Sequence, residues 1–153
     1  MISERRLSED ELRTWKGLRL MFRQLEAHLA RELARVSELS MQDYDVLSSV
    51  APLPEHRGAI KALAEHLSWS FSRLSHHLDR MARRSLVRRE PAADGVSTDV
   101  VVTEEGMAAI SAATGAHLTA VRQSFFDRLR SEDLATLERI SIEVSGNLPG
   151  SAL

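Results

Sequence analysis

The segment 70–103 constrains the fold more than any other part of the chain. Leu74, Leu78 and Met81 recur at the spacing of one apolar helical face, and Ser70 is a favourable N-cap at the start of that helix. The opposite face is polar and rich in arginine. This pattern predicts a helix that packs through one face and leaves the other exposed.

Two β-prone runs follow the helix directly and enclose a turn. The runs cover residues 87–90 and 99–103, and residues 91–95 contain Pro, Asp and Gly, which favour turns. Upstream, a helical pattern that starts after Gly58 is separated from Ser70 by a very short connection. Helices joined so tightly cross at a steep angle, so the order predicts a helix-turn-helix with a hairpin wing.

Positive charge gathers in the same region, although the chain as a whole is slightly acidic. Between His66 and Arg89 there are six arginines against Asp79 alone, whereas the formal net charge of the full sequence is −2. A concentrated basic surface is what a nucleic-acid backbone attracts. The preference for arginine over lysine suits phosphate and guanine, but it also fits a genome of biased base composition.

The composition bounds the remaining possibilities. The 153 residues, 43% hydrophobic and 27% charged, are typical of one mostly α-helical domain spanning 1–153. No apolar stretch approaches the roughly 20 residues that cross a bilayer, and the N-terminus lacks the hydrophobic part of a signal peptide, so we expect a cytoplasmic protein without membrane contact. The absence of cysteine excludes disulfides and thiol-based sensing.

Long amphipathic segments flank the winged region, which we place at 40–103. Segment 8–36 begins with a capping box and carries apolar residues at steps of three and four over about seven turns. Segment 104–146 predicts two helices, the first continuing to Leu129 and the second starting at Ser131 with its apolar residues inside. Such apolar stripes can pack within the core of a monomer or against a second subunit. We favour the second interpretation, in which both segments form dimerisation helices.

With this order of elements, the chain resembles the MarR family of winged-helix transcriptional regulators over nearly its full length. Segment 69–77, together with Asp94-Gly95, is especially similar to actinobacterial members. The motifs that carry the resemblance are Ala64-Glu65-His66-Leu67, Ser70, Ser72, Leu74, Leu78-Asp79-Arg80-Met81, Leu86-Val87-Arg88-Arg89 and Val102-Thr103-Glu104-Glu105-Gly106.

The resemblance implies a homodimer held by its first and last helices, with two recognition helices in successive major grooves of a pseudo-palindromic operator. It also implies a small aromatic or phenolic effector that binds between the dimer and DNA-binding regions and releases the DNA. Two residues depart from the family pattern. Val96 stands near where the wing usually carries an arginine, and Ser85 replaces the usual glycine, at a cost if its backbone is left-handed.

The exposed face of the predicted recognition helix and its surroundings supply the candidate contacts to double-stranded DNA. We expect Ser72, Arg73 and His76 to contact base edges, and Ser70 to combine helix capping with a phosphate contact. The basic residues farther along are assigned to phosphates, with a merely solvated surface as the alternative. The predicted DNA-binding set is Ser70, Ser72, Arg73, Ser75, His76, Arg80, Arg83, Arg84, Arg89 and Lys61.

Aromatic residues near the expected meeting point of the first, second and fifth helices define a candidate ligand pocket. Trp15, Tyr44 and His117 are its predicted members, with core packing as the alternative. Core packing is also expected for Phe71, at the margin of the apolar stripe. The six histidines suggest a zinc site, but no His-x3-His pair shares a helical face, so no metal or other cofactor is expected.

The sequence therefore predicts a homodimeric, sequence-specific DNA-binding regulator, a repressor relieved by a small molecule, rather than an enzyme. No serine lies in a nucleophile-elbow pattern, and no glycine-rich loop is suited to cradle a phosphate. Two alternatives stay open. The valine at position 96 favours a winged-helix protein-interaction module, and the histidines favour a metal-responsive regulator.

Overall fold

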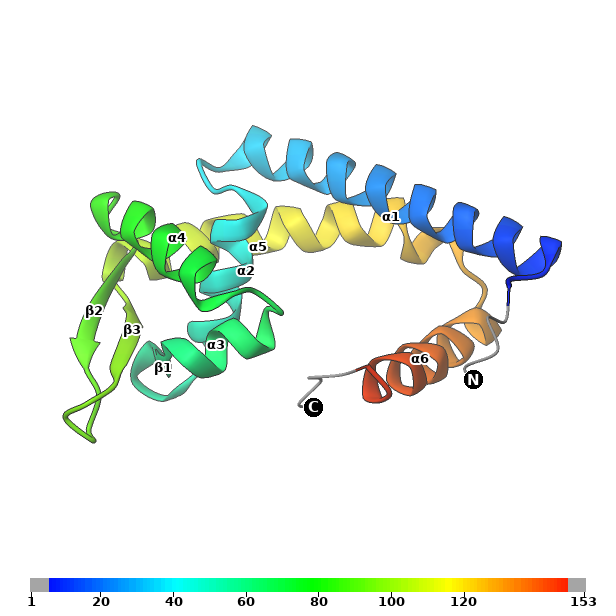
Figure 1. Ribbon diagram of the computed structural model, residues 1–153. Coiled ribbons are helices and arrows are strands. Elements are labelled where there is room, and N and C mark those ends of the chain that lie inside the picture. Colours follow the sequence, from blue (N-terminus) through cyan, green and yellow to red (C-terminus); the bar gives the residue numbers. More distant parts are fainter. Residues whose placement is uncertain (1–5, 149–153) are drawn as a thin grey trace, which may run out of the picture.

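The computed structural model describes residues 6–148, in which long helices extend from a small winged-helix region (Figure 1). The predicted fold class, mostly α-helical with a small β-hairpin wing, is confirmed. The elements in chain order are α1 (Glu9–Val36), α2 (Met41–Val50), β1 (Arg57–Ala59), α3 (Ile60–His66), α4 (Phe71–Arg83), β2 (Val87–Pro91), β3 (Thr98–Val102), α5 (Glu104–Ser124) and α6 (Ser131–Gly146).

Side-chain caps fix where three of the helices begin. At the start of α1, the Ser8 hydroxyl accepts from the backbone N–H of Glu11, whose carboxylate accepts from the Ser8 N–H. Ser40 and Asp43 form the same capping box at the start of α2. Ser70 caps α4 through its hydroxyl. The starts of α1 and α4 agree with the sequence prediction. In all three helices, the capping residues satisfy N–H groups that have no partner inside the helix.

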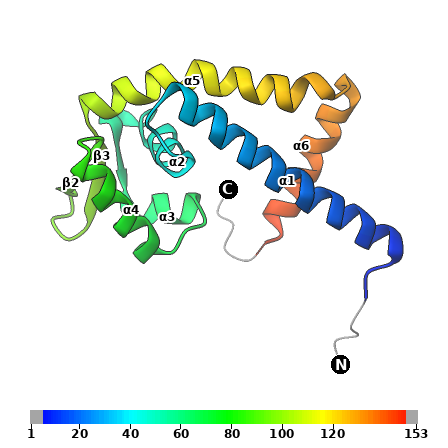
Figure 2. The ribbon, with the colours of Figure 1, turned by 90° about the horizontal axis from the view of Figure 1, so that it is seen from above.

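The long helices and the winged-helix region occupy different ends of the molecule. Figures 1 and 2 show α1 running next to α5, with α2, α3, α4 and the sheet at one end of α5 and α6 folded back from the other end. α1 reaches the winged-helix region only through its last turns, where Leu33 is 1% exposed. The winged-helix region therefore projects from a helical stem.

Three short strands form an antiparallel sheet in the order β1-β3-β2. β2 and β3 are the predicted wing hairpin, with Val87 opposite Val102. β1 was not expected from the sequence, and its Arg57 lies opposite Val101 on the other edge of β3. Three residues, one of them glycine, carry too little alternation to identify a strand.

The predicted apolar stripe of α4 is the centre of the core. Leu74, Leu78 and Met81 have no exposed surface. They pack with residues of α2, α3, the sheet and α5, among them Val46, Leu47, Val50, Ile60, Val87, Val100, Val102 and Ile110. This packing fixes which face of α4 remains available to a partner.

The connection after α4 has the left-handed backbone that makes a serine there costly. Ser85 has φ 59°, in the region where glycine is favoured. The chain turns there so that the Leu86 N–H donates to the Met81 carbonyl at 3.1 Å. Ser68, in the turn between α3 and α4, has φ 53° and bears a similar cost.

The C-terminal helices differ from the prediction in two respects. α5 ends at Ser124 rather than Leu129, and a short 3-10 turn at Phe126–Arg128 follows. α6 starts at Ser131 as predicted, but none of its residues is buried in the single chain. The expectation that its apolar residues lie inside is therefore wrong for the isolated chain, which offers α6 no second surface to pack against.

Candidate nucleic-acid interface

One sector of α4 points directly away from the core. Ser72, His76 and Arg83 are exposed and lie opposite the buried stripe. At 100° per residue, these three side chains project within a narrow range of directions. α4 thus presents a polar edge with two hydrogen-bonding side chains in its first half and a cation at its end.

Two arginines lie on the flank of α4 that faces α2. The Arg73 guanidinium carbon is 4.1 Å from the centre of the Trp69 ring, a cation–π arrangement. Arg80 Nη2 donates to His77 Nδ1 at 2.8 Å. Both guanidinium groups line a hollow of about 550 Å3 with Arg84 and residues at the start of α2, and we call it the α2–α4 hollow.

Asp43 connects the start of α2 to α4 beneath this hollow. It is 2% exposed, and its Oδ2 accepts from the Ser40 N–H at 2.9 Å and from Arg84 Nη1 at 2.7 Å. Its Oδ1 lies 3.0 Å from His77 Nε2. Burial raises the pKa of this carboxyl, but the contacts with His77, Arg84 and Ser40 outweigh it and hold the pKa of Asp43 well below its usual range.

Arg84 was predicted to contact phosphate, but the structure gives it partners within the protein. Besides the bond to Asp43, its Nη2 donates to the Glu38 carbonyl at 2.7 Å. A guanidinium that satisfies a buried carboxylate is held in place, because breaking the pair would leave the carboxylate uncompensated. The structure therefore assigns Arg84 first to joining α2 and α4.

Arg89 has a comparable structural role on the other flank of α4. Its Nη2 donates to the Ser75 carbonyl at 2.7 Å and to the Ser75 hydroxyl at 3.0 Å, and lies 2.9 Å from Asp79 Oδ1. These contacts fasten β2 of the wing to the middle of α4. Both Arg89 and Ser75 were predicted to contact DNA, and in this structure they contact each other.

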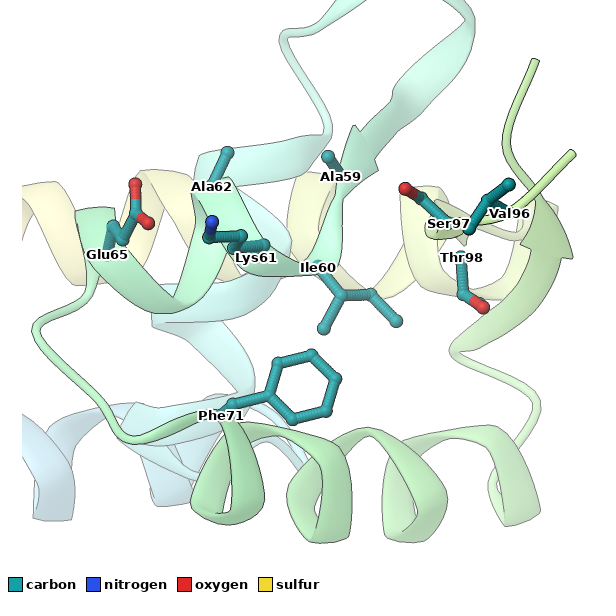
Figure 3. A pocket seen from close by; sticks show the side chains of 9 residues that line it. All are labelled: Ala59, Ile60, Lys61, Ala62, Glu65, Phe71, Val96, Ser97 and Thr98. Carbon is teal, nitrogen blue, oxygen red and sulfur yellow. The ribbon is translucent and has the colours of Figure 1, made fainter. Parts of the chain in front are cut away.

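A second hollow lies between α3, the start of α4 and the wing (Figure 3). The Phe71 ring points toward Ile60 there, while Lys61 and Val96 stand at different parts of the rim. Phe71 is 58% exposed and Val96 is 90% exposed. The expectation that Phe71 packs in the core is therefore wrong, because the first residue of α4 lies beyond the part of the helix that the core covers.

The candidate ligand residues are only partly brought together. The rings of Tyr44 and His117 lie 4.3 Å apart, between α2 and α5, and both residues are buried. Burial lowers the pKa of His117, which the nearby Asp45 partly offsets. Trp15 is 51% exposed in the first half of α1, whereas α2 lies beside the last turns of that helix. The single chain therefore does not bury Trp15 with Tyr44, and a ligand contact for Trp15 stays a prediction.

Three residues at the interface escaped the sequence analysis as site residues. The sequence analysis assigned no role in DNA binding to Asp43, Trp69 or His77. Their contacts join residues up to 41 positions apart, which periodicity within one helix does not reveal. Within residues 6–148, no group of three or more His, Asp and Glu side chains is placed to hold a metal ion.

The structure resembles solved regulators over almost its whole length. Sco3205, a MarR family transcriptional regulator from Streptomyces coelicolor solved in complex with DNA, matches with a TM-score of 0.89 at 30% identity, covering 97% of this chain and 94% of that one. AbsC, a MarR family transcriptional regulator from the same organism, matches with a TM-score of 0.90 at 30% identity, covering 96% and 99%.

More distant structures share the fold alone. A mutant of MarR from E. coli complexed with operator DNA matches with a TM-score of 0.76 at 19% identity, covering 94% of this chain and 99% of that one. No family model and no curated protein sequence matches the chain. In the part of the chain that the structure describes, no helix has both the length and the hydropathy to span a membrane.

Proposed function

The chain belongs to the MarR family of transcriptional regulators, and we propose that it binds an operator in duplex DNA as a homodimer and represses transcription by occupying it. The relatives are regulators rather than enzymes. The observation that carries the proposal is the exposed polar sector of α4, Ser72, His76 and Arg83, which is flanked by further arginines. A helix with one buried apolar face and one such polar face is suited to a major groove.

Positions on α4 divide the proposed contacts into two kinds. Ser72 and His76, in the first half of the outward sector, are proposed to contact base edges, and Arg83 at the end is proposed to contact phosphate. Arg80, on the flank, is also assigned to the backbone. Base contact by Arg73 requires its guanidinium to leave the Trp69 ring, and it stays a prediction that mutation can test.

A gel-shift experiment at two salt concentrations tests the proposal. Fragments from the region upstream of the protein's own gene serve as probes, and unrelated fragments of equal length serve as controls. We expect one fragment to bind preferentially and its affinity to fall steeply with salt, because bound phosphates release counterions. Equal, weak binding to all fragments at low salt would overturn the proposal.

Matched substitutions distinguish the two kinds of contact. Arg73→Ala and His76→Ala should each relax discrimination at one base pair, by roughly 1–3 kcal/mol. Arg83→Ala should weaken binding to all sequences about equally and reduce the salt slope by about one for each phosphate that the variant no longer binds. Uniform losses from Arg73→Ala would place that residue on the backbone instead.

The apolar surface of the helical stem supports the proposed dimer. Large side chains of α1, including Leu12, Trp15 and Phe22, and of α6, including Ile142 and Val144, are exposed in the single chain. Large apolar side chains left exposed along two helices are typical of surfaces that associate. We infer one domain in each chain, with α1, α5 and α6 forming the dimer and residues 40–103 forming the DNA-binding region.

We also propose that a small-molecule effector relieves repression by releasing the DNA. Tyr44 and His117 lie where the stem meets the winged-helix region, and His117 Nδ1 is buried without a hydrogen-bond partner in the described residues. An aromatic ligand with an acidic hydroxyl could satisfy that nitrogen. We expect simple phenols to release DNA from the protein, and His117→Phe to remove that response.

A protein-interaction module is the second candidate function. It is favoured by the wing tip, where Val96 is exposed and residues 94–99 include no basic side chain. Val96→Arg supplies a cation at this tip. If the protein binds DNA and its wing contributes little, Val96→Arg should raise the affinity for all DNA sequences. If neither the wild type nor Val96→Arg binds DNA, the protein-interaction module is favoured.

A further inference from the structure

The buried histidine of α4 occupies an unusual position for a polar residue. His77 is 6% exposed, and it shares the inward side of the helix with Leu74, Leu78 and Met81. A buried polar side chain is costly unless it is hydrogen-bonded, so its partners indicate why the position is polar. One ring nitrogen faces Asp43, and the other receives a hydrogen bond from Arg80.

The chemistry of these partners determines the tautomer of the ring. A guanidinium can only donate, so Nδ1 of His77 must accept from Arg80 Nη2, 2.8 Å away. The proton of the neutral ring is then on Nε2, which lies 3.0 Å from Asp43 Oδ1, close to the carboxylate but without the angle of a good hydrogen bond. Asp43 is itself held by Ser40 and Arg84. Asp43 therefore contacts the Nε2 side of the ring, and Nδ1 is the single acceptor that the ring offers to Arg80.

This acceptor determines where the Arg80 guanidinium lies. Arg80 is exposed, and a free arginine side chain samples many rotamers that binding must restrict. The bond to His77 holds it at the α2–α4 hollow and leaves its remaining N–H groups directed away from the ring. Arg73, Arg80 and Arg84 line the hollow together with the carboxylates of Asp43 and Glu38, so its lining has one positive charge in excess.

We propose that His77 is a positioning residue for DNA binding, which holds the Arg80 guanidinium at the α2–α4 hollow to receive one phosphate of the DNA backbone. The proposal rests on the DNA-binding function proposed above and adds a buried residue to it. His77 does not touch the DNA. It acts through Arg80, and Asp43 acts through His77 by fixing the ring.

Two substitutions of His77 separate this role from a packing role. In His77→Asn, the side-chain oxygen can take the place of Nδ1 as the acceptor for Arg80. In His77→Gln, the amide nitrogen can take the place of Nε2 as the donor to Asp43, but no acceptor faces Arg80. We expect His77→Asn to keep operator affinity within about twofold. His77→Gln and Arg80→Ala are each expected to lower it by roughly fivefold or more, and to reduce the salt slope by about one for each phosphate that is no longer bound.

A double-mutant cycle provides the second measurement. If His77 acts through Arg80, His77→Gln should weaken binding no further in the Arg80→Ala background. Additive losses, or equal losses from His77→Asn and His77→Gln while both variants show wild-type circular dichroism and thermal unfolding, would overturn the proposal.

Two results separate a failure of the positioning role of His77 from a failure of DNA binding itself. If Arg80→Ala leaves operator affinity unchanged while Arg83→Ala lowers it, the protein binds DNA but Arg80 does not meet a phosphate, and the positioning role is refuted. If the wild-type protein binds no fragment with preference, the proposed function itself fails.

Discussion

The winged-helix region and the helical stem bury their apolar side chains in different ways. The core cluster draws on α2, α3, α4, the sheet and the near ends of α1 and α5, and it is complete within one chain. In the stem, α6 has no buried residue, and Phe22 of α1 is 52% exposed. The winged-helix region thus has its own buried core, whereas the stem exposes apolar surface of the kind that the proposed dimer would cover.

The difference suggests separate roles for the two regions in the proposed dimer. The exposed sector of α4 is fixed by packing that involves no partner. In the proposed dimer, the distance between two such sectors would be set by how the stems pack. Changes to the two regions should therefore have separable consequences, which the following substitutions address in order of decreasing expected effect.

The largest effect is expected from truncation in the winged-helix core. Leu78 has no exposed surface, so Leu78→Ala should lower the free energy of unfolding by about 2–5 kcal/mol in urea denaturation. Ile142 on α6 is 60% exposed, and Ile142→Ala is the matched truncation. It should lower the apparent free energy of unfolding only by weakening association, so its effect should depend on protein concentration. Equal, concentration-independent losses would abolish the distinction between the regions.

Acid should weaken the winged-helix region through Asp43. Its pKa is lowered in the folded chain, so the unfolded chain binds the proton first, and the stabilisation is present above the ordinary Asp pKa of about 3.9 and lost as the pH falls below it. Asp43→Asn should cost about 1–3 kcal/mol at neutral pH. Urea unfolding measures the difference in free energy of unfolding between the wild type and Asp43→Asn. That difference should be smaller near pH 3 than at neutral pH, and an equal difference at both would contradict the prediction.

A charge on the stem should affect association and leave the winged-helix core intact. Phe22→Glu places a carboxylate on the exposed apolar side of α1, and the dimer dissociation constant should rise about tenfold or more, which is roughly 1.4 kcal/mol. Sedimentation equilibrium measures it. Ser48→Glu makes the same change of charge on the exposed side of α2 and should leave association unaltered.

The smallest effect is expected at the turn that ends α4. Ser85 has φ 59°, which costs a residue with a side chain about 1 kcal/mol relative to glycine. Ser85→Gly should therefore raise the unfolding midpoint by about 2–4 °C in a thermal melt. An unchanged or lowered midpoint would mean that the Ser85 side chain contributes more than its backbone costs.

Local pattern predicted most of the fold, because the signals lie within single elements. The capping residues Ser8, Ser40 and Ser70 and the stripe of α4 placed the helices, and the turn at 91–95 placed the wing. Gly106, part of the motif after the wing, is explained by the structure: a Cβ there would collide with the Leu86 carbonyl oxygen. Elements without a periodic signal, such as β1 and the early end of α5, were missed.

The candidate site was predicted less well than the fold. Residue type and helical position identified the exposed residues of α4, including His76 and Arg83. They did not show that Arg84 bonds to Asp43 or that Arg89 bonds to Ser75, because these contacts cross between elements. Whether an arginine is free for DNA depends on carboxylates and carbonyls brought near by the fold, which spacing along the chain does not encode.

Two consecutive residues of α2 contact different helices. Asp43 is bonded toward α4, and the ring of its neighbour Tyr44 lies against His117 of α5. α2 has only ten residues, and both side chains are buried, so one short helix contacts α4 and α5 at adjacent positions. A ligand that displaced the Tyr44 ring would therefore act on the residue next to the one that holds Arg84.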